Sequence, residues 1–185
     1  MTSGLALRLA RDHRRLGRVL DLLAGLIERF DAGEESSYDL FRELIEYVVD
    51  YVERVHHPTE DVLFTRLAAQ APAQAAILAD LMREHRELTQ LSRDFRDALA
   101  SIMHGAVLPR ATVVRQGREL VRRMRAHIDR EDETALPLAS ALLSETEWAA
   151  LATQAPNDAD PIFGQPDPLR FRALYDHLKD VLDPL

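Results

Sequence analysis

Four stretches of this 185-residue chain repeat apolar residues in alternating steps of three and four, and this repeat limits the fold more than any other feature. Residues with this spacing share one face of an α-helix and form the seam along which helices pack. The seams are Leu9, His13, Leu16, Leu20, Leu23, Ile27 and Phe30; Phe41, Ile45, Val48, Val52, His56, Glu60, Leu63 and Leu67; Leu78, Leu81, His85, Leu88, Ser92, Phe95, Leu99 and Ile102; and Val113, Gly117, Leu120, Met124, His127 and Glu131. We therefore predict an all-α fold, an antiparallel up-down-up-down four-helix bundle.

Capping residues, glycines and prolines mark the ends of these predicted helices. We expect helices over about residues 5–30, from a cap at Ser36 or Ser37 to about 67, from Pro72 to about 104, and from 113 until the helix fades near Leu136 and Pro137. Pro58 lies inside the second helix and removes one backbone donor. We expect it to bend or loosen that helix between His56 and Glu60, without breaking it, because the apolar repeat resumes in register.

The last 45 residues follow a different pattern, so we divide the chain into a bundle at 1–140 and a C-terminal helical extension at 141–185. Ser144 and Glu147 form a capping box that predicts a short helix through Trp148 and Leu151. Residues 155–168 contain four prolines and predict a loop. A final amphipathic helix is expected from Asp167-Pro168, with Phe171, Leu174, Tyr175, Leu178 and Leu182 on one face. The extension either folds over the bundle or joins two copies as a homo-oligomer.

Composition excludes several classes of function. The chain has no cysteine, so thiolate nucleophiles, iron–sulfur clusters and Cys-ligated zinc are excluded. Its net charge of −8 argues against general binding of nucleic acid. The sequence after Met1 contains no apolar run of signal-peptide or membrane-spanning length. We therefore expect a cytoplasmic protein with neither nucleic acid nor membrane as a partner.

The turns between the predicted helices place the seam histidines at one height in the bundle. His13 lies about 20 residues before the first turn and His56 about 20 after it, at ~1.5 Å per residue. His85 lies about 20 residues before the third turn and His127 about 18 after it. Antiparallel neighbours with these offsets bring their histidines together, so we expect four imidazoles in one inward-facing layer.

Two glutamates belong to the same layer. Glu60 follows His56 by four residues and Glu131 follows His127 by four, so each shares a helix face with its histidine. A buried glutamate is unfavourable unless it is paired or bound to a metal. Imidazole suits first-row metals, and a carboxylate from each pair can bridge two of them. We therefore expect two non-haem, carboxylate-bridged iron ions, with zinc or another first-row metal as the alternative.

Two other features of this region have weaker interpretations. Glu53 and His56 form a Glu-x-x-His step, which is also typical of ferritin-like bundles. That architecture needs a second such step, and Met124 stands where its glutamate would be, three residues before His127. We therefore reject the ferritin-like interpretation. His57 points about 100° away from His56, and we interpret it as a supporting or surface residue.

Over about residues 5–140 the chain resembles the hemerythrin-like, or HHE cation-binding, domain family. The resemblance lies in the order and spacing of His13, His56-His57-Pro58-Thr59-Glu60-Asp61, Glu84-His85, and His127-Ile128-Asp129-Arg130-Glu131. It implies a four-helix bundle with a non-haem di-iron centre bridged by two carboxylates and a small oxygen species. Carried over residue by residue, the implied metal ligands are His13, His56, Glu60, His85, His127 and Glu131.

The chain departs from the family's oxygen carriers at one ligand. Those proteins place a second histidine one turn after the first on the third helix, where this chain has Thr89. Four histidines instead of five leave one metal with a solvent position, or with an oxygen ligand such as Glu84. This departure argues against simple oxygen carriage and favours reactivity, sensing or a different metal.

Three hypotheses for function remain at this point. The first is a di-iron protein that binds or senses a small ligand: dioxygen, peroxide or nitric oxide. The second is an enzyme that acts on peroxide, oxygen or nitric oxide, or a protein that delivers iron for the repair of metal centres. The third is a structural bundle that holds zinc or mixed metals. No proton-shuttling or other catalytic residue can be assigned from the sequence.

Overall fold

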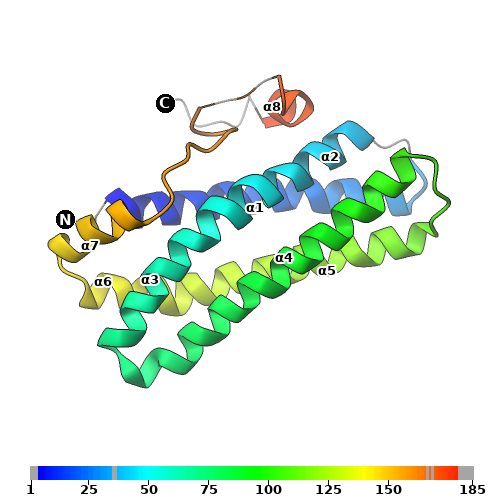
Figure 1. The fold of residues 1–185 in the computed structure, drawn as a ribbon. Coiled ribbons are helices and arrows are strands. Elements are labelled where there is room, and N and C mark those ends of the chain that lie inside the picture. Colours follow the sequence, from blue (N-terminus) through cyan, green and yellow to red (C-terminus); the bar gives the residue numbers. More distant parts are fainter. Residues whose placement is uncertain (1–3, 35–36, 166, 168, 179–185) are drawn as a thin grey trace.

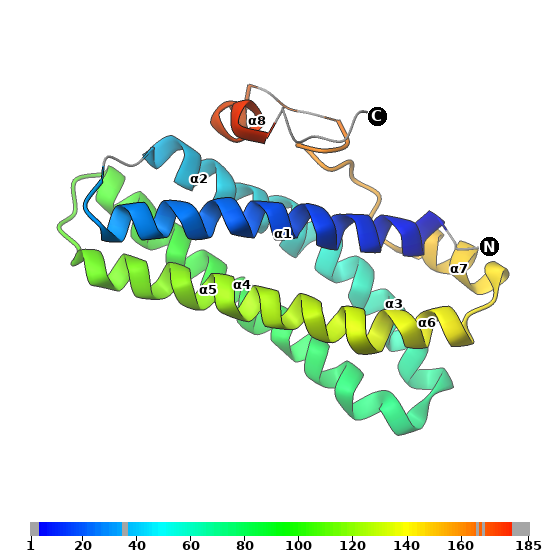
Figure 2. The same ribbon diagram turned by 180° about the vertical axis from the view of Figure 1, so that it is seen from behind.

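The computed structural model describes residues 4–34, 37–165, 167 and 169–178, and these residues form a helical bundle (Figure 1). Its long helices are α1 (Gly4–Asp31), α2 (Tyr38–Tyr47), α3 (His57–Gln70), α4 (Ala75–Met103) and α5 (Arg110–Arg130). A wider π-helical segment, η1 (Val48–His56), joins α2 to α3 without a break. Helix α5 packs between α1 and α4, which both views show (Figures 1 and 2). The predicted all-helical bundle is therefore confirmed.

The helix ends use the residues that the sequence indicated. Ser37 caps α2, its hydroxyl accepting a hydrogen bond from the backbone N–H of Leu40 at 3.3 Å. Gly33 and Gly105 follow α1 and α4 with φ of 80° and 87°, the left-handed conformation that glycine adopts most easily. Pro72 begins a single 3₁₀ turn, η2 (Pro72–Gln74), that leads into α4. Ser36, the other predicted cap, lies outside the described residues.

Two π-helical segments lie just before prolines. In η1 the N–H of His57 bonds to the carbonyl of Val52, five residues back, and Pro58 follows at once. In η3 (Glu131–Ala135) the N–H of Leu136 bonds to the carbonyl of Glu131, and Pro137 follows. A proline lacks the backbone donor that an α-helical turn requires, and a wider turn accommodates that loss. The helix is therefore loosened near Pro58 without a break, as predicted, but in the segment before the proline, Val48–His56, and not between His56 and Glu60, where α3 is a regular α-helix.

The fourth helix is longer than the sequence suggested. We expected it to fade near Leu136 and Pro137, but η3 leads directly into α6 (Leu136–Leu142). The prediction was wrong because Pro137 is the second residue of α6, a position that needs no backbone donor. Glu131 therefore lies inside a continuous helix, with α5 before it and the π-helical turn of η3 after it.

The buried apolar residues form two clusters with a polar layer between them. One cluster contains Leu16 and the following seam of α1, and the other contains Leu5 and Leu9 from the preceding turns. The same division recurs along α4, where Leu88 and Leu81 belong to different clusters. On each helix the seam histidine lies at the boundary, so the apolar cores hold the polar layer from both sides.

The C-terminal residues pack onto the bundle. Helix α7 (Glu145–Gln154) begins with the predicted capping box of Ser144 and Glu147, and its Trp148 and Leu151 join the second apolar cluster. Helix α8 (Arg172–Leu178) lies beside α2, where a buried Glu43 carboxylate accepts the backbone N–H of Leu174 at 2.9 Å. The extension therefore folds over the bundle of its own chain. Leu182, predicted for the last helix, lies outside the described residues.

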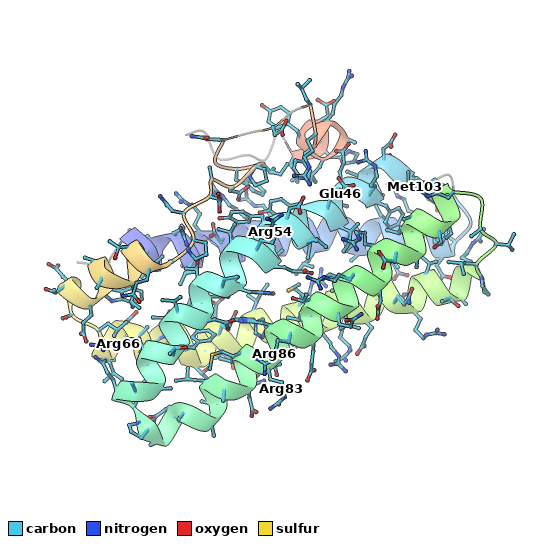
Figure 3. The ribbon with its side chains drawn as sticks, viewed as in Figure 1. Glu46, Arg54, Arg66, Arg83, Arg86 and Met103 are labelled. Carbon is cyan, nitrogen blue, oxygen red and sulfur yellow. The ribbon has the colours of Figure 1, made fainter. Side chains whose placement is uncertain are left out.

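The outer faces of the helices are strongly charged. Arg54, Arg83 and Arg86 extend away from the ribbon of η1 and α4, and all three are exposed (Figure 3). Within the described part of the chain, no helix combines the length and apolar character needed to cross a membrane. Polar outer faces and an apolar seam are the arrangement expected for helices that pack on one side only.

Gly117 gives a test of the packing between α1, α4 and α5. A Cβ atom at this position would lie 2.7 Å from Ile27 Cδ1 and 3.0 Å from Phe95 Cε2, both of which are buried in the first cluster. We expect Gly117→Ala to lower the free energy of unfolding by ~1–3 kcal/mol, measured by urea denaturation. Gly25→Ala is the control, since a Cβ at that exposed helical position meets nothing within 4 Å. It should stabilise the protein by ~0.5–1 kcal/mol; equal effects of the two changes would contradict the packing described.

Candidate metal centre

The structure brings all six predicted site residues into one buried layer. The four imidazoles come from α1, η1, α4 and α5. The two glutamates come from α3 and η3. The histidines are 2–4% exposed and both glutamates are 0% exposed. The residues are His13, His56, Glu60, His85, His127 and Glu131. Counting residues from each turn therefore predicted correctly that these side chains share one layer.

Glu60 faces imidazoles from three helices. Its Oε1 lies 3.0 Å from His13 Nε2 and 3.4 Å from His56 Nε2. Its Oε2 points the other way, 3.6 Å from His85 Nε2. One carboxylate thus reaches the imidazoles on both sides of the layer.

Glu131 has the complementary arrangement. Its Oε1 lies 3.1 Å from His127 Nε2 and 3.2 Å from His85 Nε2. Its Oε2 lies 3.5 Å from His13 Nε2, across the layer. The two glutamates therefore each connect one pair of histidines to a member of the other pair.

Three of the histidines are oriented by carboxylates on their outer side. His13 Nδ1 bonds to Asp132 Oδ1 at 2.7 Å, and His85 Nδ1 bonds to Asp61 Oδ1 at 2.7 Å. An N–H that donates from Nδ1 to a carboxylate fixes the ring and leaves Nε2 directed at the interior. Such partners are typical of metal-bound histidines.

Glu84 gives His127 the same support. Its Oε2 accepts from His127 Nδ1 at 2.9 Å, while its Oε1 accepts from the guanidinium of Arg130. Glu84 was considered above as an extra metal ligand. It faces the outer nitrogen of His127, so its contacts are those of a supporting residue.

His56 differs from the other three histidines. Its Nδ1 lies 3.7 Å from Asp12 Oδ2, beyond hydrogen-bond distance. That carboxylate oxygen instead accepts a hydrogen bond from the hydroxyl of Tyr51 at 3.1 Å. The outer partner of His56 is therefore shared with a buried tyrosine.

His57 is a fifth buried histidine in this layer. It is 3% exposed, and its ring stacks on that of His85 with centroids 4.2 Å apart and planes 10° apart. It also meets the ring of His127 edge-on at 5.7 Å. Ring nitrogens of these three histidines lie within 4.8 Å of one another. The surface position considered for His57 is therefore wrong.

The electrostatics of the layer follow from its burial and its carboxylates. Burial opposes a charge on His13 and His85, but their hydrogen bonds to Asp132 and Glu60, and to Asp61 and Glu131, outweigh it. The pKa of His13 rises to about 11 and that of His85 to about 10. Burial dominates at His57, beside the other imidazoles, and lowers its pKa well below the usual value. His57 is therefore a neutral nitrogen donor at physiological pH.

Several buried atoms of the layer lack a hydrogen bond within the described part of the chain. They are His56 Nδ1, His57 Nδ1, His127 Nε2, Glu60 Oε2 and Glu131 Oε2. Buried nitrogen and oxygen atoms without partners are unfavourable, and a cation in the layer would satisfy His127 Nε2 and the two glutamate oxygens. His56 Nδ1 faces outward, towards Asp12. The groups whose donor atoms lie close enough for one ion are His13, His56 and Glu60; Glu60, His85 and Glu131; and His57, His85 and His127. The residues present therefore fit a centre of two first-row metals.

A comparison with protein-family models agrees with this geometry. Residues 6–139 match the model of the hemerythrin HHE cation binding domain, which is most of the chain. The chain belongs to the hemerythrin HHE family. Searches of curated proteins and of solved structures gave no match. The matched residues include every histidine and glutamate of the layer.

In this hemerythrin-family chain a surface cleft borders the layer at His127. It has a volume of about 220 Å³, opens between α4 and α5, and has His127 in its lining. Its mouth is charged, with Arg123 joined to Glu87 at 3.0 Å and Arg130 joined to Glu84. The cleft therefore lies on the outer side of His127, where Glu84 bonds to its Nδ1.

Sequence reasoning missed His57 and the outer carboxylates Asp12, Asp61 and Asp132. His57 was assigned by its angle from His56, yet a helix inside a bundle contacts two neighbours. His56 faces His13 on α1, with ring centroids 5.1 Å apart, while His57 faces His85 on α4. The adjacent pair of histidines was the signal, because both can be buried on a wide inner face.

The raised pKa values predict how metal binding depends on pH. In protein stripped of metal, His13 and His85 stay protonated up to about pH 10–11, so a metal must displace one proton from each. Affinity for zinc, measured by chelator competition, should therefore increase with pH, by about a hundredfold per pH unit between about pH 7 and 9. Histidines with an ordinary pKa of ~6.5 would leave the affinity nearly constant in this range. A constant affinity would contradict the described contacts.

Proposed function

We propose that this hemerythrin-family protein holds two non-haem iron ions between Glu60 and Glu131. One ion binds His13 and His56, the other binds His85 and His127, and the two carboxylates bridge them. Iron in such a site supplies redox-active positions for dioxygen, peroxide or nitric oxide. The proposal also includes the antiparallel up-down-up-down order of the rods, which the packing of α1 on α5, α5 on α4 and α4 on α3 supports.

One observation supports this proposal above the others: each glutamate spans the layer. Glu60 lies 3.0 Å from His13 and 3.6 Å from His85 through its two oxygens, and Glu131 lies 3.5 Å and 3.2 Å from the same two histidines. A carboxylate that binds a single ion does not have to lie close to the histidines on both sides of the layer. Two carboxylates that do so match a pair of ions more closely than one ion or an empty polar core.

His57 completes the proposed ligand set. The chain has Thr89 where oxygen carriers of the family have a second histidine on the third helix. His57 brings a neutral imidazole to the same side of the layer, next to His85 and His127. We therefore assign it to the second ion as a fifth imidazole. This assignment removes the main argument against reversible ligand binding.

The function that this arrangement supports best is binding or sensing of a small ligand by the iron pair. The cleft beside His127 brings the protein surface close to the histidine that would hold the second ion. The chain's part is to hold the ions, orient the imidazoles through the outer carboxylates and keep bulk water away. We propose that it does so in the cytoplasm.

Anaerobic loading with ferrous iron, followed by air, tests the proposal. We expect about two irons per chain and a visible charge-transfer band on exposure to air that is reversed when oxygen is removed. Rapid bleaching with turnover of peroxide would favour the enzyme hypothesis instead. Failure to bind iron, together with tight zinc binding, would contradict the proposal and favour a structural metal.

A matched pair of variants tests the ligand set in the same experiment. His85→Ala removes an imidazole from the second ion and should lower the iron content from about two ions to about one or fewer per chain. His104→Ala is the control, since His104 is exposed at the end of α4 and bonds only to its own helix. Circular dichroism checks that both variants keep their helices. Full iron content in His85→Ala would show that the ligand assignment is wrong.

A further inference from the structure

A buried tyrosine pair begins beside the metal centre and leads away from it. The Tyr51 hydroxyl donates to Asp12 Oδ2 at 3.1 Å, and the same oxygen lies 3.7 Å from His56 Nδ1. One turn earlier, the Tyr47 hydroxyl donates to Asp160 Oδ2 at 3.2 Å. Both tyrosines are 2–4% exposed. Each phenol therefore has a carboxylate of its own in the protein interior.

The two phenol rings are in contact, and the contacts continue to the C-terminal segment. Tyr47 and Tyr51 stack with centroids 5.7 Å apart and planes 25° apart. Phe163 meets the edge of Tyr47 at 6.4 Å, and the Arg15 guanidinium lies 4.9 Å from the Phe163 ring. This segment passes over α1 and α2 on its way to α8 (Figures 1 and 2). These contacts run from Asp12, beside His56, through the two phenols to Phe163 and the half-buried Arg15.

The chemistry of these groups suits the transfer of electrons. Burial and the nearby carboxylates raise the pKa of both tyrosines, so both hold their protons at neutral pH. A phenol that loses an electron becomes strongly acidic, and its proton must leave with the electron. Asp12 and Asp160 already accept hydrogen bonds from the two hydroxyls, so each can receive that proton without rearrangement.

We propose that Tyr51 and Tyr47 relay single electrons from the turn at residues 160–163 to the metal centre. This inference rests on the proposed iron ligands and on the second hypothesis for function, an enzyme that acts on peroxide, and it assigns a function to residues outside the iron site. It requires an oxidant, hydrogen peroxide, and a small one-electron reductant, for which ascorbate is the probe. The cleft beside His127 opens between α4 and α5, whereas Tyr47 and Tyr51 belong to α2 and η1.

Each electron moves in three balanced steps. Tyr51 gives one electron to the oxidised centre, and its O–H bond breaks as the proton passes to Asp12 Oδ2. Tyr47 then reduces Tyr51, which recovers its proton, while the Tyr47 proton passes to Asp160 Oδ2. Ascorbate returns one electron to Tyr47, which recovers its proton in turn. Two such cycles and two solvent protons convert one hydrogen peroxide to two waters, with cleavage of the O–O bond.

Electron paramagnetic resonance of the iron-loaded protein tests this relay. After addition of peroxide we expect the signal of a neutral tyrosyl radical, which ascorbate removes. Tyr51→Phe should abolish the signal. Tyr47→Phe should keep it but slow its removal by ascorbate several-fold, because the route to the surface is then interrupted. Tyr175→Phe, in α8 and outside the series of contacts, is the control and should behave as the unchanged protein.

A further variant separates the relay from simple loss of folding. Asp160→Asn keeps both tyrosines but removes the carboxylate that accepts the Tyr47 proton, so ascorbate should remove the radical several-fold more slowly while iron content and helicity remain normal. Iron content is measured first for every variant. If the unchanged protein binds no iron, the proposed function and the relay both fail. If it binds iron but forms no tyrosyl radical, or if the radical persists in Tyr51→Phe, the relay alone is overturned.

Discussion

The structure depends on the burial of two carboxylates, Glu60 and Glu131, halfway along a helical bundle. Both are completely buried, and four imidazoles surround them. Unpaired charges in such a place are strongly unfavourable, so the layer needs positive charge from protonated histidines or from metal ions. Burial and the neighbouring His127 and His85 act in opposite directions on Glu131, and the imidazoles prevail and lower its pKa. The layer is thus built to attract cations.

The rest of the chain holds this layer in position. Apolar clusters on both sides exclude water, and Asp61, Asp132 and Glu84 fix three imidazoles from outside. His56 is the exception, because Asp12 is engaged by Tyr51. The two π-helical segments end or begin at His56 and Glu131. Wider turns at functional residues are a recurring feature of helices, and here they coincide with the prolines that make a regular turn impossible.

Much of this arrangement could be predicted from the sequence. The apolar repeats predicted the helices. The number of residues from each turn predicted that His13, His56, His85 and His127 lie at the same height in the bundle, because the rise per residue of a helix is constant. The sequence-based prediction failed at two positions where the outcome depends on contacts with other helices or on the preceding turn. His57 seemed to leave the inner face, but that face is wide enough to contact both α1 and α4. Pro137 suggested that the fourth helix ends there, yet the π-helical turn before it allows the helix to continue as α6.

The outer carboxylates and the tyrosine pair were beyond prediction for a different reason. Asp132 contacts His13 across 119 residues of sequence, and Asp160 contacts Tyr47 across 113. No periodic pattern connects residues so far apart, so only the folded arrangement reveals them. The extension's Phe171 and Leu174 lie in the core of their own chain, which agrees with the first of the two arrangements expected for it, folding over its own bundle.

Anomalous diffraction at the iron absorption edge, from crystals of the iron-loaded protein, tests the central claim most directly. Two bridged ions predict two neighbouring peaks in the buried layer. One should lie between His13, His56 and Glu60, and the other should lie near His85, His127 and Glu131. A single peak, peaks confined to surface carboxylates, or a layer with no peak would contradict the account.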